Sequence, residues 1–214
     1  MAESPHSLAP PAPVAPGLRI GLLGGSFNPA HEGHRHISAV ALRRLGLDYI
    51  WWLVSPQNPL KPEAGMAPLA RRLEAARRCA SHPRIVAMDI ERQLGTRYTV
   101  DTVSALQRRF PQVHFIWVMG SDALEQFHLW RNWQEIAARL PIAVVTRPGS
   151  VLAALNSPAA RRLAPFRTDV TAHFAQIRPP ALIVLDGKRN PQSATAIRAA
   201  GPPNETLVPA RPAW

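Results

Sequence analysis

Short apolar runs alternate with amphipathic segments along most of the chain. The apolar runs are rich in aliphatic residues and tryptophan, and most end at glycine or proline, which is typical of buried strands. They predict strands over 18–23, 49–54, 84–90, 113–120, 142–149 and 181–187. The range 142–149 includes a turn at its end. Between them, apolar residues recur at helical spacing and predict helices over 34–45, 69–80, 100–110 and 122–140 (as one or two helices), with a short helix from Ser193. Residues 151–178 fit neither pattern.

Strands that alternate with helices form βαβ units, so the pattern predicts an α/β fold. We expect a Rossmann-like, doubly wound and mostly parallel sheet with helices on both faces. Sheets of this kind bind ligands in the loops beyond the carboxyl ends of their strands. Functional residues are therefore expected in the loops 24–34, 55–62, 120–122, 146–149 and 187–198.

The two ends of the chain do not follow this pattern. Proline and alanine dominate residues 1–17, which predicts a disordered tail, followed by a single domain over 18–200 and an irregular tail over 201–214. The first segment lacks the basic and apolar regions of a secretory signal, and no apolar run reaches the roughly 20 residues of a membrane span. The single cysteine, Cys79, excludes an intramolecular disulfide and a multi-thiolate metal site, and it fits a reducing cytoplasm.

The formal net charge of +11 comes almost entirely from arginine, because lysine occurs only twice. A guanidinium group holds two phosphate oxygens at once, so an arginine excess suits a phosphate-bearing ligand. The alternative is a compositional preference, combined with solvated helix faces that carry Arg43, Arg44, Arg71 and Arg72.

The stretch GLLGGSFNPAHEGHRH contains the densest group of candidate residues. An apolar run ends at Gly24 and Gly25, where glycine permits positive φ and the close approach of a ligand. His31, His34 and His36 follow where a helix is predicted to begin, and the start of a helix favours anions. The stretch lacks the third glycine of GxGxxG and the GK[ST] of a Walker A loop. The histidines could contact a phosphate, ligate a metal, or cap and pack the helix.

The segment GGSFNPAHEGH resembles the G-[GT]-[ST]-F-[DN]-P-x-H-x-G-H signature of the HxGH nucleotidyltransferase superfamily. Later motifs resemble those of one branch, the bacterial nicotinate-nucleotide adenylyltransferases, and they occur in that family's order. These five motifs are SPQNPLK (55–61), RYTVDTV (97–103), GSDAL (120–124), LWRNWQEI (129–136) and TRPG (146–149). The segment SATAIR (193–198) resembles the S-[SA]-T-x-[IL]-R element of nucleotidylyl transferases in general. The chain departs from the family at Asn28, where many members have aspartate. It also departs in a shorter 55–61 loop and in a proline-rich end where the family has a helix.

The resemblance implies an enzyme of NAD biosynthesis that transfers AMP from ATP to nicotinate mononucleotide, giving nicotinate adenine dinucleotide and pyrophosphate. It implies catalytic roles for His31, His34 and Arg198. The residues implied for ATP are Gly24, Gly25, Ser26, Phe27, Gly120, Asp122, Ser193 and Thr195. The residues implied for nicotinate mononucleotide are Asn58, Lys61, Tyr98, Thr99, Trp130 and Arg147. The resemblance also implies Mg²⁺, held by substrate phosphates and water rather than by a metal site of the protein.

Two alternatives stay open. The same fold could serve nicotinamide mononucleotide or another phosphate ester as the acceptor. A basic RNA-binding protein would also account for the positive charge and the six tryptophans. However, the tryptophans lie largely in apolar patterns, and no RNP-like or KH-like signature is present. The resemblance therefore implies ATP and nicotinate mononucleotide as partners, we expect no nucleic acid and no membrane, and the oligomeric state stays open.

Overall fold

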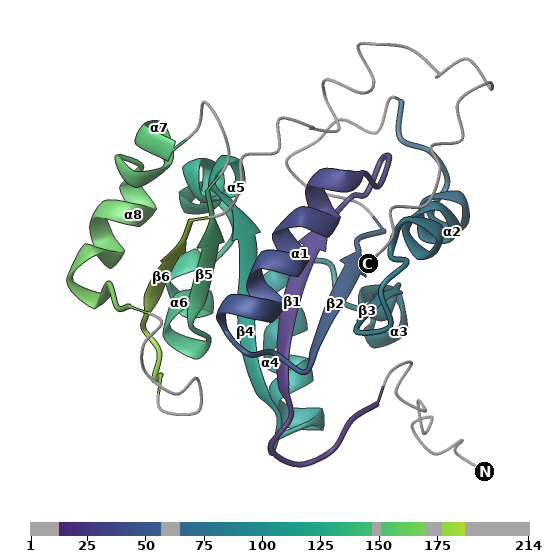
Figure 1. Ribbon diagram of the computed structural model, residues 1–214, viewed down its shortest axis with the longest axis horizontal. Helices are drawn as coiled ribbons and strands as arrows, with labels where there is room; N and C mark the ends of the chain where they lie inside the picture. The colour runs from purple at the N-terminus through teal and green to yellow at the C-terminus, as the bar shows by residue number, and fades with distance from the viewer. Residues whose placement is uncertain (1–12, 57–64, 147–150, 170–176, 187–214) are drawn as a thin grey trace.

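The computed structural model describes residues 13–56, 65–146, 151–169 and 177–186 (Figure 1). Within these residues, six strands form one sheet in the order β3-β2-β1-β4-β5-β6, and every neighbouring pair is parallel. The strands are β1 (Arg19–Gly25), β2 (Tyr49–Val54), β3 (Ile85–Met88), β4 (His114–Gly120), β5 (Ile142–Val145) and β6 (Leu182–Leu185). The strand order reverses between β1 and β4, which confirms the predicted doubly wound, Rossmann-like fold.

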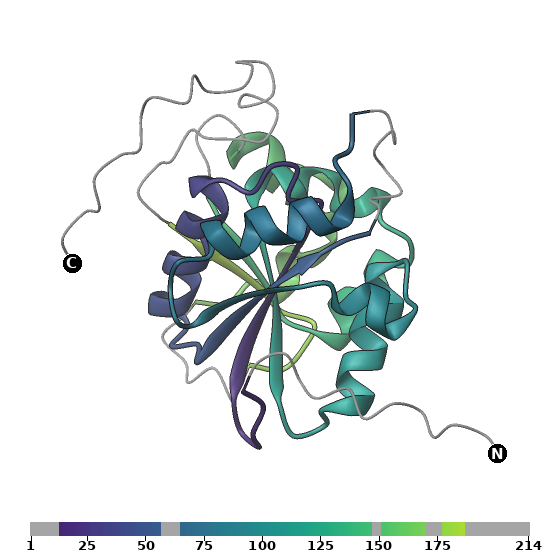
Figure 2. The same ribbon diagram turned by 90° about the vertical axis from the view of Figure 1, so that its right-hand side faces the viewer.

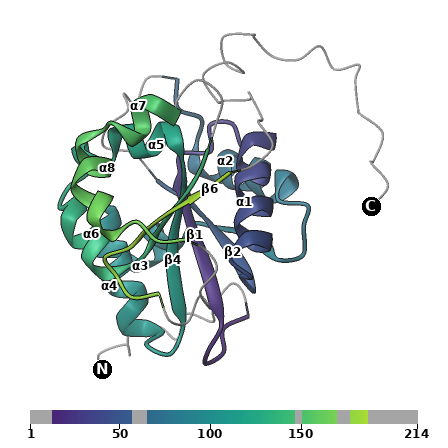
Figure 3. The same ribbon diagram turned by 60° about the vertical axis from the view of Figure 1, so that its left-hand side comes forward.

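Helices cover both faces of the sheet. Figure 3 shows α1 (Glu32–Arg44) and α2 (Leu69–Cys79) on one side, and α3 (Ile90–Leu94), α4 (Thr99–Arg109) and α6 (Trp133–Arg139) on the other. Figure 2 shows that the strands between them fan out, as the right-handed twist of strands requires. The other described helices are α5 (Ser121–Gln126), η1 (Phe127–Leu129), α7 (Val151–Leu155), α8 (Pro158–Leu163) and η2 (Ala164–Phe166). None of the helices in the described part of the chain is long and apolar enough to cross a membrane.

The strands are buried on both faces, so successive side chains enter two different cores. Leu22, Trp51 and Trp117 pack in the core beneath α4 and α6, whereas Leu23 and Trp52 pack in the core beneath α1 and α2. The three tryptophans are at most 1% exposed and are among the largest fully buried side chains. Each of them contributes a large apolar area to the core.

Two predicted boundaries are wrong at the edge of the sheet that faces the site. The first strand does not end before the glycines, because Gly24 and Gly25 pair in register with Leu53 and Val54 of β2. The strand predicted over 84–90 ends at Met88, because α3 begins at Ile90. These differences lengthen one strand and shorten another without changing the topology.

The helical segments also differ from their predictions. The helix predicted over 34–45 begins earlier, at Glu32, where His31 caps it. Residues 122–140 form α5, η1 and α6, because the chain breaks at Trp130 and at Asn132, which has φ 49°. The described part of 151–178 is mostly helical. Its helices are too short for a helical period to show in the sequence.

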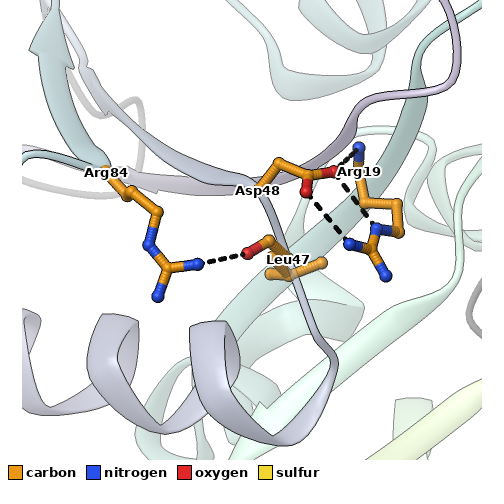
Figure 4. A network of polar contacts seen from close by, with 4 residues as sticks. All are labelled: Arg19, Leu47, Asp48 and Arg84. Carbon is orange, nitrogen blue, oxygen red and sulfur yellow. Dashed lines mark hydrogen bonds and ion pairs between the residues drawn. The ribbon is translucent and has the colours of Figure 1, made fainter.

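A polar network holds the opposite, amino-terminal edge of the sheet (Figure 4). The Arg19 guanidinium donates from Nε to Asp48 Oδ2 at 3.1 Å and from Nη2 to Oδ1 at 3.0 Å. The Arg19 amide donates to Oδ2 at 2.8 Å, and Arg84 Nη1 donates to the Leu47 carbonyl at 3.2 Å. Hydrogen bonding with Arg19 lowers the pKa of Asp48, and the same bonds raise the pKa of Arg19. The network ties the start of β1 to the residue before β2 and so supports their register.

Candidate active site

A pocket of about 330 Å³ lies at the carboxyl ends of β1 and β2. Its walls come from segments that are far apart in the sequence: β1, the residue after β2, α3, the start of α4, β4, and the turn before α6. Five residues singled out from the sequence line it together, namely Gly24, Gly25, Tyr98, Thr99 and Trp130. The position agrees with the rule that doubly wound sheets bind ligands at this edge.

Tryptophan side chains set the shape of the pocket beside β1. A Cβ atom at Gly24 would lie 2.8 Å from ring atoms of Trp117, so this glycine makes room for an indole. The Trp130 ring packs edge-on against Trp117 and Phe127, with centroid distances of 5.8 Å and 5.3 Å. These contacts fix the orientation of Trp130 in the pocket wall. Neither glycine uses the positive φ that its residue type permits, because Gly24 and Gly25 belong to the extended strand.

Tyr98 lies at the start of α4, and two arginines lie over its ring. The Arg131 guanidinium carbon is 4.5 Å from the centre of the Tyr98 ring, and that of Arg97 is 5.9 Å away. Both arginines and Tyr98 line the pocket. Tyr98 is also the N-cap residue of α4, and no side chain caps this helix. The positive end of the α4 dipole therefore borders the pocket, together with the two guanidinium groups.

Glu91 contributes a buried carboxyl group to the pocket wall. The residue is 5% exposed, and its Oε2 atom has no hydrogen-bond partner among the described residues. Burial raises the pKa of Glu91 to about 7, although hydrogen bonding with the hydroxyl groups of Ser55 and Thr102 lowers it in part. This carboxyl therefore keeps its proton to a higher pH than an exposed glutamate does, and in its protonated form it can donate as well as accept a hydrogen bond.

The two histidines of the HxGH motif order each other at the start of α1. His31 Nδ1 accepts from the Gly33 amide at 3.0 Å, and His34 Nδ1 accepts from the His31 amide at 3.2 Å. Because Nδ1 is an acceptor in both rings, each neutral imidazole carries its proton on Nε2. The ring centroids are 4.0 Å apart. The histidines therefore cap the helix, as one of the three predictions proposed, and also hold two Nε2–H donors in fixed positions.

The metal alternative for the histidines receives no support from the described residues. Across residues 13–56, 65–146, 151–169 and 177–186, no three histidine, cysteine, aspartate or glutamate residues form a group that could hold a metal ion.

Phe27 connects the histidines to the pocket. Its ring is stacked on Trp52 at a centroid distance of 5.1 Å and lies 4.5 Å from the His34 ring. A Cβ at Gly25 would lie 3.4 Å from the same phenyl ring, so Gly25 separates the pocket from Phe27. Phe27 is 1% exposed and has φ 47°, an uncommon value for a bulky residue. Since its side chain is buried, Phe27 can contact a ligand only through its main chain.

One of the four arginines that were predicted to lie on solvated helix faces is buried. Arg43, Arg44 and Arg71 are exposed, as a solvated helix face requires. Arg72 is not, because it is 3% exposed. The prediction that Arg72 belongs to a solvated face is therefore wrong.

The Arg72 guanidinium joins three segments through their main-chain carbonyl groups. It donates to Ser26 and Ser55 at 2.7 Å each, and to Pro56 and Ala67 at 2.8 Å each. No carboxylate of the described ranges pairs with it, and burial lowers its pKa. Arg72 thus ties the loop after β1 to the loop after β2 and to the segment before α2.

Asn28 makes a second connection to the segment before α2. Its Nδ2 donates to the Gly65 carbonyl at 3.0 Å, and its Oδ1 accepts from the Ala67 amide at 3.3 Å. An aspartate could accept from Ala67 but could not donate to Gly65. The structure therefore explains locally why asparagine, rather than the aspartate that many members of the similar family have, stands at position 28.

The other predicted residues are placed differently. Gly120 ends β4 and pairs with Val145, and Asp122 is exposed in the first turn of α5. Neither is among the described residues that line the pocket. The remaining predicted residues lie outside the described part of the chain: Asn58, Lys61, Arg147, Ser193, Thr195 and Arg198.

Several residues of the pocket were missed by the sequence analysis. Arg97 and Arg131 lie inside motifs that drew attention to their neighbours. Glu91 could have been found, because an acidic residue directly after a predicted strand lies at the ligand-binding edge. Trp117 carried no such signal, since its surroundings in the sequence are those of any core strand.

A doubly wound parallel sheet with a pocket at its switch point and imidazole donors at a helix start defines a nucleotide-binding α/β protein. A family model described as cytidylyltransferase-like matches residues 22–200. The chain therefore belongs to the cytidylyltransferase-like family, and it is a nucleotidyltransferase.

Curated relatives and solved structures agree with this family. The chain is 55% identical over 190 residues to a probable nicotinate-nucleotide adenylyltransferase of Parvibaculum lavamentivorans, covering 88% of this chain and 94% of the relative. It is 53% identical over 182 residues to one from Cereibacter sphaeroides, covering 85% and 97%. The structure of Plasmodium falciparum nicotinic acid mononucleotide adenylyltransferase complexed with NaAD aligns with a TM-score of 0.64 at 14% identity, covering 85% of this chain and 83% of that one. At that identity the structural likeness supports the fold alone.

Proposed function

We propose that this protein is a nicotinate-nucleotide adenylyltransferase, which transfers AMP from ATP to nicotinate mononucleotide. One observation carries the proposal: Gly25 lines an aromatic pocket that holds two arginines, and it lies next to Phe27, whose ring contacts the His34 ring of the His31–His34 pair. The reaction needs these two neighbouring sites, one for a flat ring and one for a polyphosphate. The names of the relatives that are 55% and 53% identical support the choice of acceptor.

In the proposed reaction, a phosphate oxygen of nicotinate mononucleotide attacks the α-phosphorus of ATP. The bond to the β-phosphate oxygen breaks, and pyrophosphate leaves. The attacking oxygen is already ionised at neutral pH, so catalysis needs alignment and charge stabilisation rather than a general base. We assign the Nε2–H groups of His31 and His34, with main-chain amides near Ser26 and Phe27, to the α-phosphate and its neighbours. Each well-placed donor of this kind contributes about 2.7–4 kcal/mol to transition-state stabilisation.

The pocket is the proposed site of the acceptor. The pyridine ring would lie near Trp130, whose orientation its neighbours fix, with Tyr98 and Thr99 close by. By family resemblance, Arg198, Ser193 and Thr195 would hold the leaving pyrophosphate, and Asn58, Lys61 and Arg147 would contact substrate phosphates or the mononucleotide. Gly120 and Asp122 would border the adenosine.

The donor set around the histidines suits magnesium only as an ion carried by the nucleotide. His31 and His34 offer nitrogen donors, whereas Mg²⁺ prefers carboxylate, phosphate and water oxygens. We therefore propose that the triphosphate and water hold the ion, which would neutralise phosphate charge in the reaction.

The proposal is tested by incubating the purified protein with MgATP and either nicotinate mononucleotide or nicotinamide mononucleotide. Pyrophosphate release is measured, and the dinucleotide product is identified by mass. We expect pyrophosphate release with each acceptor in separate reactions, and a much higher kcat/KM for the acid. Higher activity with the amide would mean that nicotinamide mononucleotide is the acceptor. No release with either mononucleotide would refute the proposal.

A further inference from the structure

Two guanidinium groups of the pocket have no acidic partner among the residues that the structure describes. Arg97 and Arg131 are both exposed, and both lie over the ring of Tyr98. Among the described residues, the ion pairs use other arginines, and neither Arg97 nor Arg131 pairs with a carboxylate. Arg131 is the closer of the two to the Tyr98 ring, at 4.5 Å against 5.9 Å. A guanidinium held over an aromatic ring keeps N–H groups that can donate to a further acceptor.

The charge balance of the pocket favours an anion. Arg97 and Arg131 are permanently positive, and the start of α4 adds the positive end of a helix dipole. Glu91 is the acidic residue among the described lining residues. Its charge is partly suppressed near neutral pH, because burial raises its pKa to about 7. The pocket therefore has a net positive charge beside Trp130.

We infer that Arg131 is a specificity-determining residue that selects an acceptor with a carboxylate on its aromatic ring over the corresponding carboxamide, and that Arg97 adds positive charge beside the same Tyr98 ring. The inference rests on the proposed function and deepens it. Both mononucleotides carry the same ribose phosphate, so only the ring substituent differs between them. Arg131 directly follows Trp130 in the turn before α6, which places its guanidinium at the same wall as the proposed ring site.

The variants Arg131→Gln and Arg131→Lys test the inference. With saturating MgATP, kcat/KM is measured for the acid and the amide acceptor. For Arg131→Gln we expect the acid-to-amide ratio to fall about tenfold, the scale of one charged hydrogen bond at a partly exposed site. The KM for ATP should not change. Arg131→Lys should keep more of the preference than Arg131→Gln, because it keeps the charge.

Arg108→Gln is the matched control, because Arg108 is exposed in the last turn of α4, at the end away from Tyr98. It removes the same charge from the protein, and we expect the ratio to stay at the wild-type value. An unchanged ratio in a folded Arg131→Gln protein would overturn the inference. An equal loss of kcat/KM for both acceptors would also overturn it, because it would indicate a role in packing or in phosphate binding.

A binding experiment separates this inference from the proposed function. Quenching of tryptophan fluorescence measures the affinity of each mononucleotide without turnover, because Trp117 and Trp130 line the pocket. If the wild-type protein transfers AMP to neither mononucleotide, the proposed function fails, but the binding ratio still tests Arg131. A tighter wild-type binding of the acid that is lost in Arg131→Gln supports the inference. Equal binding of both mononucleotides by the wild-type protein contradicts it.

Discussion

Replacing Glu91 by glutamine is predicted to stabilise the protein at neutral and alkaline pH but not at about pH 4.5. Burial raises the pKa of this carboxyl from 4.5 to about 7 in the folded protein. Between these two pH values the folded state holds a proton that the unfolded state has lost, so stability falls as the pH rises through this window. At about 1.4 kcal/mol for each pH unit, the loss reaches about 3 kcal/mol above neutral pH. Glutamine has no charge at any pH, so the variant avoids this loss.

The assay is urea unfolding of the wild-type protein and the Glu91→Gln variant at about pH 4.5, about pH 6 and about pH 8. The difference in the free energy of unfolding should be near zero at the lowest pH and approach about 3 kcal/mol in favour of the variant at the highest. Glu125→Gln is the control, since Glu125 is exposed on α5 and its replacement relieves no buried charge. A difference that does not grow with pH would refute the reasoning, because it would mean that the Glu91 carboxylate is as well solvated in the folded state as in the unfolded state.

Three further changes are predicted. His34→Ala should lower kcat by about 100- to 1,000-fold, which is the usual effect of losing one transition-state donor. It should reduce the free energy of unfolding by no more than about 1 kcal/mol. Near-normal turnover in a pyrophosphate-release assay would remove His34 from the mechanism. Arg72→Met should destabilise the protein by about 3 kcal/mol or more in urea unfolding, because it removes the donor of four carbonyl groups. Arg72→Lys should recover part of the lost free energy of unfolding. A wild-type unfolding midpoint for Arg72→Met would contradict the assigned role. Asp48→Asn should cost about 1 kcal/mol at neutral pH with unchanged kcat/KM. Because Arg19 lowers the pKa of Asp48, this stabilisation is present above pH 3.8 and is lost as the pH falls through the folded-state pKa, so the two proteins should converge in acid.

The sequence was sufficient to predict the fold because its strands are apolar on both faces. The runs 49–54 and 113–120 correspond to β2 and β4 almost residue for residue. Continuous apolar strands that alternate with amphipathic helices leave few arrangements other than a doubly wound parallel sheet. Prediction was poorer where an element is one or two turns long, as in α3 and α7, because so short a segment shows no helical period.

Family motifs identified residues in the pocket wall but not those that support the site from behind. Tyr98 and Trp130 belong to motifs with fixed spacing, and both line the pocket. Arg72 lies in a run of arginines and alanines that resembles any solvated helix. Its burial depends on three carbonyl-bearing loops that come together only in the folded chain, so no local pattern could show it.

Ser55 shows why such supporting residues matter for the site. Its carbonyl accepts from the buried Arg72 guanidinium, and its hydroxyl hydrogen-bonds with the buried Glu91 carboxyl. A single residue after β2 therefore connects a buried cation behind the loops to a buried acid in the pocket wall. Buried polar groups are costly when they lose a partner, so a change at either end is felt at the other. Double-mutant cycles should accordingly show a coupling free energy of unfolding between Arg72 and Glu91 that is absent between Arg72 and the exposed Glu125. This coupling would act through Ser55 and needs no direct contact between Arg72 and Glu91.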